Sequence, residues 1–170
     1  MRGVGKKRPH RPSQRLEAVA LLPRAYRDTA RAMSQENVEL AARFYEPQGS
    51  KAEILAAMPR AMELCHPDIE WIDDPSRADG ATHHGRDGVR EALERWLESF
   101  DEYRFEVQRI VDCGDARVLV VGREFGRGAK SGAEISTVNY ELLTFRDGKI
   151  VRYQEFYDRA EALDAAGLSE

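Results

Sequence analysis

The sequence predicts an α+β domain, in which helices and an antiparallel sheet occupy separate parts of the chain. Two helical patterns fill residues 34–65, one strand and a third helix fill 69–100, and four strand patterns follow one another from residue 103. Consecutive strands favour antiparallel pairing, and segregated helices and strands are typical of this class. We expect a long, strongly curved sheet to wrap over three helices and to leave a conical cavity at one end.

The first helix is expected to begin at Ser34, a favourable N-cap residue. Val38, Ala41 and Tyr45 follow at helical spacing, and Pro47-Gln48-Gly49 should end the helix. The sequence therefore predicts that the folded domain starts close to residue 33.

The second helix has a capping box, with Ser50 as N-cap and Glu53 three residues later. Pro59 lies inside this helix and is expected to kink or split it, because proline lacks the amide proton of the helical ladder. His66-Pro67 should close it, since the residue before a proline avoids the helical region.

Residues 69–73 read as a first strand that runs into Asp74-Pro75, and residues 76–85 read as a polar loop. The third helix has the clearest pattern in the chain. Its apolar stripe is formed by Val89, Ala92, Leu93, Trp96, Leu97 and Phe100 on an otherwise charged cylinder.

Four strands are predicted at residues 103–113, 117–125, 134–145 and 149–158. Asp147-Gly148 lies between the last two, and an Asp-Gly pair between alternating runs is the strongest short-range hairpin signal. Residues 160–166 should form a short terminal helix that stops at Gly167. We expect the last hairpin to form one wall of a pocket.

Charge is distributed unevenly along the chain, whose formal net charge is −4. Residues 1–32 contain nine Lys or Arg against two acids, and they form a basic, proline-bearing extension that is expected to be disordered or helical. The acidic body, residues 33–170, argues against nucleic acid as the main partner. An alternative is that the basic extension recruits an anionic partner while the domain only dimerises.

Two cysteines, Cys65 and Cys113, lie far apart and form no CxxC pair or disulfide framework. Unpaired thiols suit a reducing cytoplasm, which is the expected location. No apolar run approaches the 18 residues or so that a membrane span requires.

The chain resembles the SnoaL-like domain proteins of the NTF2-like superfamily, which include relatives of polyketide cyclases and ketosteroid isomerases. Three segments carry the resemblance: His66-Pro67-Asp68-Ile69-Glu70-Trp71, Gly85-Arg86-Asp87-Gly88-Val89-Arg90, and Arg146-Asp147-Gly148-Lys149-Ile150 with the following Tyr157 to Leu163. The resemblance implies a cone-shaped α+β fold, a pocket for a small molecule and a homodimer. It does not imply one activity, because this fold hosts cyclases, isomerases, epoxide hydrolases, dehydratases and non-catalytic binders.

The resemblance to ketosteroid isomerases also suggests roles for particular residues. Asp74 before Pro75 is similar to their general base, and Glu141 occupies the position of their protonated oxyanion-hole acid. Their tyrosine of the first helix falls near Phe44, with Tyr45 adjacent.

Side chains alternate along a strand, so one pocket residue sets the orientation of its strand. With Glu141 inward, Asn139 faces inward too, and Val121, Arg123 and Phe125 of the preceding strand would follow. On the last strand the resemblance places Tyr153, Glu155 and Tyr157 inward, and Trp71 is expected as a further wall of the pocket. Arg123 would be the electrostatic partner of the carboxyls. The opposite face, which includes Val138, Tyr140 and Phe156, would pair with a second subunit.

Several carboxyls in one pocket suggest a neutral acid beside an ionised base, a pair that can move a proton next to a carbonyl. The hypothesis is a cofactor-free acid–base isomerase, cyclase or hydrolase acting on a small apolar carbonyl compound or epoxide. The alternative is a non-catalytic binding module, in which Arg123 forms a structural salt bridge with Glu141 or Glu155 and Asp74 only opens a turn.

His83 and His84 are adjacent and should point apart, so a metal site that combines them with Asp73 or Asp74 is not favoured. We expect one of the pair, His84, to lie near the pocket mouth, and we expect neither metal nor cofactor.

Overall fold

A computed structural model describes residues 24–46 and 49–168 of the chain. The chain divides into two compact units, residues 1–32 and 33–170. The first 23 residues of the basic extension lie outside the described residues, and so does the expected helix end at Pro47-Gln48.

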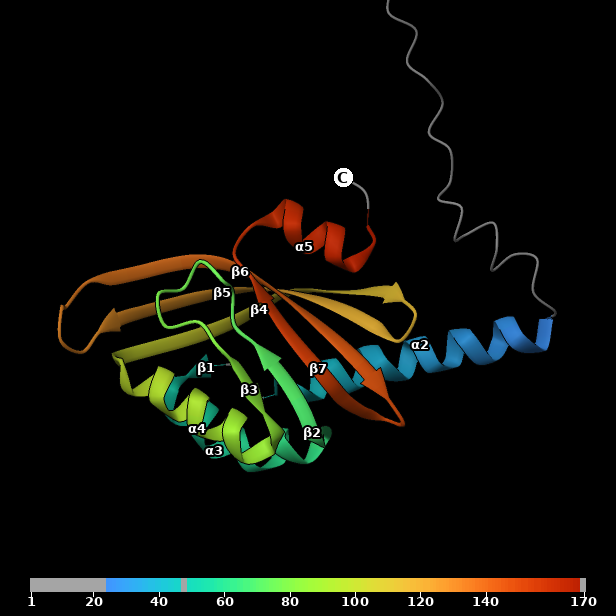
Figure 1. Cartoon of the computed structure of the whole chain (residues 1–170), viewed down its shortest axis with the longest axis horizontal. Coiled ribbons are helices and arrows are strands. Elements are labelled where there is room, and N and C mark those ends of the chain that lie inside the picture. Colours follow the sequence, from blue (N-terminus) through green and yellow to red (C-terminus); the bar gives the residue numbers. More distant parts are fainter. Residues whose placement is uncertain (1–23, 47–48, 169–170) are drawn as a thin grey trace, which may run out of the picture. The chain divides into compact units, whose positions relative to one another are not determined.

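A seven-stranded sheet forms the centre of this unit, in the order β1-β4-β5-β6-β7-β2-β3 (Figure 1). The strands are β1 (Gly49–Ser50), β2 (Cys65–Ile72), β3 (Thr82–His84), β4 (Phe100–Gly114), β5 (Arg117–Gly128), β6 (Glu134–Arg146) and β7 (Lys149–Phe156). All neighbours are antiparallel except β2 and β7, which run parallel. The predicted α+β class and the antiparallel order of the last four strands are confirmed.

The turn between β6 and β7 is the predicted two-residue hairpin. Arg146 pairs with Lys149, and the two residues between them are left-handed, with φ of 52° at Asp147 and 68° at Gly148. Two left-handed residues are the hallmark of a type I′ turn, whose twist matches that of the strands. This turn sets the pairing at the tip of the last hairpin, and a register shift between Thr144 and Phe145 separates the tip from the pairs farther along.

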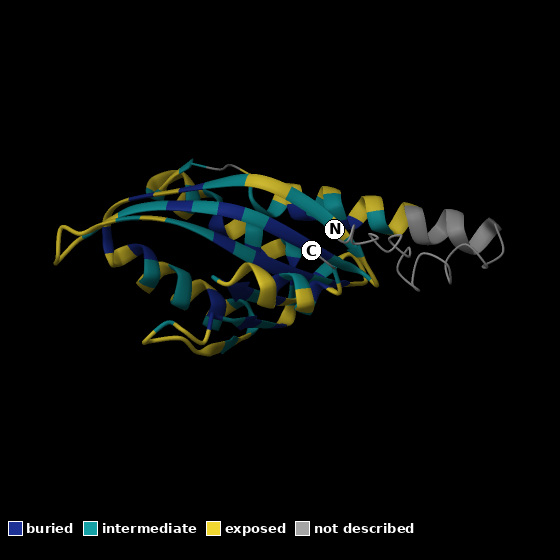
Figure 2. Ribbon diagram, turned by 90° about the horizontal axis from the view of Figure 1, so that it is seen from above, coloured by how far each residue is buried: buried dark blue, intermediate teal, exposed yellow. Residues whose placement is uncertain are grey.

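The sheet is curved, and its concave face is covered by helices α3 (Lys51–Leu64) and α4 (Gly85–Glu98) (Figure 1). Register shifts interrupt the β4–β5, β6–β7 and β2–β7 ladders, and such bulges bend a strand. The main core joins the concave face to these helices and to the end of α2 (Arg24–Phe44), through residues such as Ala41, Met58, Val89, Leu97 and Leu143. Figure 2 shows the buried positions along the middle of the strands.

A second, smaller core lies on the convex face, beneath the terminal helix α5 (Arg159–Ala166). Ala162 and Ala166 of this helix pack against Leu119, Leu142 and Phe156. Gly167 ends the helix in the left-handed conformation, as predicted. The two cores show that both faces of the sheet bury apolar side chains.

The predicted start of the first helix at Ser34 is wrong. Helix α2 already includes residues from Arg24 onward, and the Ser34 hydroxyl donates a hydrogen bond to Asp112 on β4 instead of capping a helix. Ser34 is a good cap only where the chain before it is non-helical, and the ten preceding residues continue the helix.

The second helix begins as predicted, with the reciprocal Ser50–Glu53 capping box in place. Pro59 does not split α3, which continues from Lys51 to Leu64 and ends at Cys65 rather than at His66. The polar loop after the first strand also contains a short strand that the sequence did not suggest, since β3 adds to the free edge of β2.

Candidate active site

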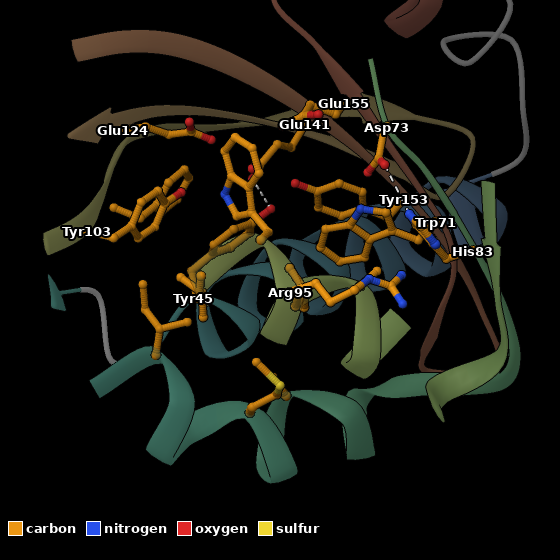
Figure 3. Close-up of a pocket in the computed structure, with 18 of the residues that line it drawn as sticks. Tyr45, Trp71, Asp73, His83, Arg95, Tyr103, Glu124, Glu141, Tyr153 and Glu155 are labelled. Carbon is orange, nitrogen blue, oxygen red and sulfur yellow. Dashed lines mark hydrogen bonds and ion pairs between the residues drawn. The ribbon is translucent and has the colours of Figure 1, made fainter. Parts of the chain in front are cut away.

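A cavity of about 370 Å³ lies between the concave face of the sheet and the helices (Figure 3). Its helical wall is mostly apolar, with Arg95 of α4 as a charged member. The apolar residues of this wall are Phe44, Ile54, Ala57, Met58, Ala61, Met62, Ala92, Leu93, Trp96 and Leu97. Its sheet wall contains the ionisable and aromatic groups Trp71, Asp73, Tyr103, Phe105, Glu124, Glu141, Tyr153 and Glu155. Most apolar side chains of the cavity therefore lie on its helical wall, and most ionisable groups lie on its sheet wall.

Four carboxyl groups on the sheet wall come from adjacent strands. Glu124 lies on β5, Glu141 on β6 and Glu155 on β7, and Asp73 directly follows β2. Glu141 and Glu155 are direct cross-strand partners. All four are buried, with at most 7% of each residue exposed, so each must be protonated or paired.

Glu141 accepts hydrogen bonds from three neighbouring side chains. The Tyr45 hydroxyl donates to its Oε2 atom, Asn139 Nδ2 donates to its Oε1 atom at 3.1 Å, and Tyr153 also bonds to the carboxyl. Burial raises the pKa of Glu141 to about 8, despite the two tyrosine hydrogen bonds that oppose the rise. The carboxyl is consequently mostly neutral at pH 7.

Glu124 is linked to Glu141 through the same amide. Asn139 Nδ2 donates to Glu124 Oε1 at 2.8 Å, and Tyr103 donates a second hydrogen bond to the carboxyl. Burial, followed by the nearby Glu155 charge, raises the pKa of Glu124 to about 7. At neutral pH this group is close to half ionised beside a neutral Glu141.

Asn139 itself is fully buried and does not line the cavity. Its position depends on Gly122, the residue opposite it on β5, because a Cβ atom there would lie 2.8 Å from Asn139 Oδ1 and would collide with the Phe105 ring. The absent side chain at Gly122 thus leaves room for the amide that bridges the two glutamates.

Glu155 is paired with a cation, in contrast to Glu124 and Glu141. Arg77 Nη1 lies 3.3 Å from Glu155 Oε2 and 3.6 Å from Asp73 Oδ1, and its guanidinium stacks over the Trp96 ring at 4.1 Å. Burial raises the pKa of Glu155, while the Asp74 amide and Arg77 act in the opposite direction. Arg77, not Arg123, is the cation that neutralises this wall.

Asp73 orients a histidine near the β2–β3 end of the cavity. His83 Nε2 lies 3.0 Å from Asp73 Oδ2, and the Ala81 amide donates to the same oxygen at 3.2 Å. His83 lines the cavity, whereas its neighbour His84 is exposed and outside it. The expectation that His84 is the histidine near the pocket is therefore wrong, since Trp71 pairs with His83 and adjacent strand residues face opposite sides.

Trp71 and Tyr153 form a stacked pair on the cavity wall, with ring centroids 3.4 Å apart and an interplanar angle of 10°. Trp71 and Trp96 are the two tryptophans of the chain, and both line the cavity. Intrinsic tryptophan fluorescence is therefore a suitable readout for ligand binding in the cavity.

The predicted orientation of β5 is wrong. Val120 pairs with Glu141 and Val121 with Tyr140, so the even-numbered residues of β5 face the cavity and Glu124 takes the place expected for Arg123. Val121 and Phe125 lie on the convex face. Arg123 shares that face and donates to Ser136 Oγ at 3.3 Å. The register depends on the loop between β5 and β6, whose conformation the sequence pattern did not define.

Asp74 is buried but turns away from the cavity. Its Oδ1 atom accepts from the Ser76 amide at 2.8 Å and from the Ser76 hydroxyl, and its Oδ2 atom accepts from the Tyr157 amide at 2.8 Å. Burial opposes ionisation, but these hydrogen bonds outweigh it and lower the pKa of Asp74. The geometry corresponds to the turn-opening alternative, and the acid that reaches the cavity is its neighbour Asp73.

Tyr157 stands beside the cavity without lining it, and its hydroxyl lies 3.3 Å from Glu155 Oε1. Among the other predicted pocket residues, the structure places Trp71, Glu141, Tyr153 and Glu155 on the cavity wall. Sequence reasoning missed Glu124, Arg77 and Arg95. For Glu124 the signal was present, because an acid that alternates with Val118, Val120 and Gly122 shares their face.

Within the described part of the chain, no three His, Cys, Asp or Glu side chains come together as metal ligands would. None of the helices described is long and apolar enough to cross a membrane.

The fold and the cavity define a class of protein: a curved α+β cone with ionisable groups inside it. The SnoaL-like domain model matches residues 52–153, and the chain belongs to this family. No curated protein matches the chain in sequence.

Solved structures share the NTF2-like fold. An NTF2-like protein of unknown function from Burkholderia pseudomallei is 20% identical, with a TM-score of 0.62 over 76% of this chain and 95% of its own. An NTF2-like protein from Burkholderia thailandensis is 26% identical, with a TM-score of 0.60 over 75% and 96%. A phenazine biosynthesis-related protein from Pseudomonas aeruginosa is 20% identical, with a TM-score of 0.56 over 84% and 92%.

Proposed function

We propose that this protein is a cofactor-free acid–base enzyme that moves a proton on a small, largely apolar carbonyl compound. The observation that carries the proposal is the pair Glu124 and Glu141, held by one amide nitrogen inside an apolar cavity. Because both Oε1 atoms accept from Asn139 Nδ2, at 2.8 and 3.1 Å, they lie no more than about 6 Å apart. A base and an acid at that separation can reach the α-hydrogen and the oxygen of one carbonyl unit.

The two glutamates take different roles because their proton affinities differ. Glu141, mostly neutral at pH 7, donates a hydrogen bond to the substrate carbonyl, supported by the buried Tyr45 and Tyr153 hydroxyls. Glu124, partly ionised at the same pH, removes the α-hydrogen as a proton while Glu141 transfers its proton to the carbonyl oxygen, which produces an enol. Return of the oxygen proton to Glu141 and of the carbon proton from Glu124 to a conjugated carbon completes an isomerisation, and return to the same carbon exchanges the α-hydrogen.

The base in this proposal is Glu124 rather than Asp74. Asp74 keeps its carboxylate in hydrogen bonds to Ser76 and to the Tyr157 amide, outside the cavity lining. Glu155 is also less suited, because Arg77 and the Asp74 amide already occupy one of its oxygens.

The test is exchange of α-hydrogens in D₂O, followed by proton NMR on a panel of small aryl ketones such as 1-phenylpropan-2-one and 2-tetralone. The wild-type protein should accelerate exchange. Glu141→Gln and Glu124→Gln should each reduce the accelerated rate by about a hundredfold or more, since positioned acids and bases contribute that much.

The matched control is Glu70→Gln, because Glu70 lies on the outside of β2 in an exposed ion pair with Arg152. This variant should exchange at the wild-type rate. Ligand binding without exchange in the wild-type protein, or equal rates in all three variants, would instead support a non-catalytic binding module.

A further inference from the structure

The charged side chains that line the cavity do not all have a partner of opposite charge. Glu141 is mostly neutral, Glu155 pairs with Arg77, and Asp73 contacts both Arg77 and His83. Asp79 is likewise within 3.6 Å of Arg77 Nε. Arg77 is therefore already in ion-pair contact with three acids.

Arg95 also lines the cavity, but it takes part in none of these ion pairs. It lies on α4 and lines the cavity, and it has no ion pair or side-chain hydrogen bond among the described residues. Figure 3 shows its side chain extending along the cavity beneath Trp71, with the guanidinium on the side where His83 lies. Glu46, an exposed acid that also lines the cavity, is not within ion-pair distance of it.

His83 offers a second polar atom at this end of the cavity. Its Nε2 atom is held by Asp73, which fixes the ring, and its Nδ1 atom has no partner among the described residues.

We propose that Arg95, with His83, binds a carboxylate group of the ligand at the mouth of the cavity. The substrate class is then a small aromatic or alicyclic acid, with its apolar body against the helical wall and its reactive carbonyl turned toward Glu124 and Glu141. This inference rests on the proposed function for the reaction, but the binding preference can be measured without any turnover. A guanidinium suits this role, because its planar fork matches a carboxylate.

The test compares 3-phenylpropionate with 3-phenylpropionamide, two probes of nearly equal size that differ in charge. Binding is followed by tryptophan fluorescence, because both tryptophans line the cavity. Arg95 is exposed at its place on the cavity lining. The wild-type protein should bind the acid about tenfold more tightly than the amide, as one charge-assisted hydrogen-bonded pair provides. Added salt should weaken binding of the acid and leave the amide unchanged.

Two variants, each with a matched control, test which side chains cause the preference for the acid over the amide. Arg95→Gln should abolish the preference for the acid, whereas Arg90→Gln should retain it, since Arg90 on the same helix pairs with Asp87 outside the cavity. His83→Gln should reduce the preference, whereas His84→Gln should not, because His84 is exposed and outside the cavity.

Equal or tighter binding of the amide to the wild-type protein would overturn the proposal. So would a preference for the acid that survives in Arg95→Gln, or failure of both probes to bind at millimolar concentration. A failed preference together with intact α-hydrogen exchange would remove this inference alone. Absent exchange with the preference intact would remove the proposed reaction and leave the carboxylate site.

Discussion

At the scale of a single residue, Glu141 combines burial with hydrogen bonds from the Tyr45 and Tyr153 hydroxyls and from the Asn139 amide. The donors favour the ionised carboxylate and burial favours the neutral acid, and burial prevails. The same side chain is consequently costly to the folded state at high pH and useful as a proton donor at neutral pH.

The stability of the protein should therefore depend on pH through Glu141. Its pKa rises on folding from 4.5 to about 8, so its stabilising effect is full below about pH 4.5 and is lost as the pH rises through about 8. Relative to Glu141→Gln, the free energy of unfolding of the wild type should fall by roughly 4 kcal/mol between pH 5 and pH 9. Urea unfolding of both proteins at several pH values measures this difference.

Glu70→Gln serves as the control for that comparison, because Glu70 is 44% exposed in its side chain. This variant should keep the pH dependence that the wild type owes to Glu141. Parallel pH curves for wild type and Glu141→Gln would show that the carboxyl is not protonated in the folded protein.

At the scale of an element, the register of β5 against β6 decides which side chains enter the cavity. A shift by one residue would replace Glu124 with Arg123 and would change a wall of acids into a salt bridge. Gly122 is part of this arrangement, because the absence of a side chain there leaves room for the Phe105 ring and the Asn139 amide.

Gly122→Ala should accordingly destabilise the protein by about 1–3 kcal/mol, since the added methyl group overpacks a site with no free space. Gly88→Ala is the matched control. It lies in α4 with nothing within 4 Å of the added atom, and it should stabilise the protein by about 0.5–1 kcal/mol through helix propensity. Thermal unfolding measures both changes, and equal effects of the two substitutions would contradict the close packing around Gly122.

At the scale of the unit 33–170, the sheet separates two environments. The concave face holds the larger core and the cavity, and the convex face holds the smaller core beneath α5. Beyond that helix, Val121, Arg123, Phe125 and Val138 remain partly exposed on the convex face. We propose that this region pairs two copies of the chain, as the resemblance implies.

Light scattering coupled to size-exclusion chromatography should then give twice the mass of one chain. Val138→Arg should yield monomers, because Val138 lies opposite Arg123 in the β5–β6 ladder and a second cation there places like charges side by side in the interface. Leu55→Asp, a change at a position on α3 that is 38% exposed, should remain dimeric. A wild-type protein that stays monomeric at high micromolar concentration would exclude this interface.

The sequence by itself determined the class of fold, the order of the elements and the last hairpin. Helical and strand periodicities, the Ser50–Glu53 capping box and the Asp147-Gly148 turn are local signals, and each depends on residues within a few positions of one another. The inward face of β7 did not follow from the turn, because the Arg146–Lys149 pair alone would place Glu141 opposite Gln154, whereas a register shift between Thr144 and Phe145 pairs it with Glu155. The resemblance, rather than the local pattern, indicated that face.

Only the tertiary structure decided which groups meet in the cavity. The β5–β6 register, the turn that directs Asp74 to Ser76 while Asp73 meets His83, and the approach of Tyr45 to Glu141 all join residues that are distant in sequence or separated by an irregular loop. The physical reason is that the local pattern allows several strand registers and several side-chain partners. Packing across the sheet and the burial of charged groups make one of them the most stable.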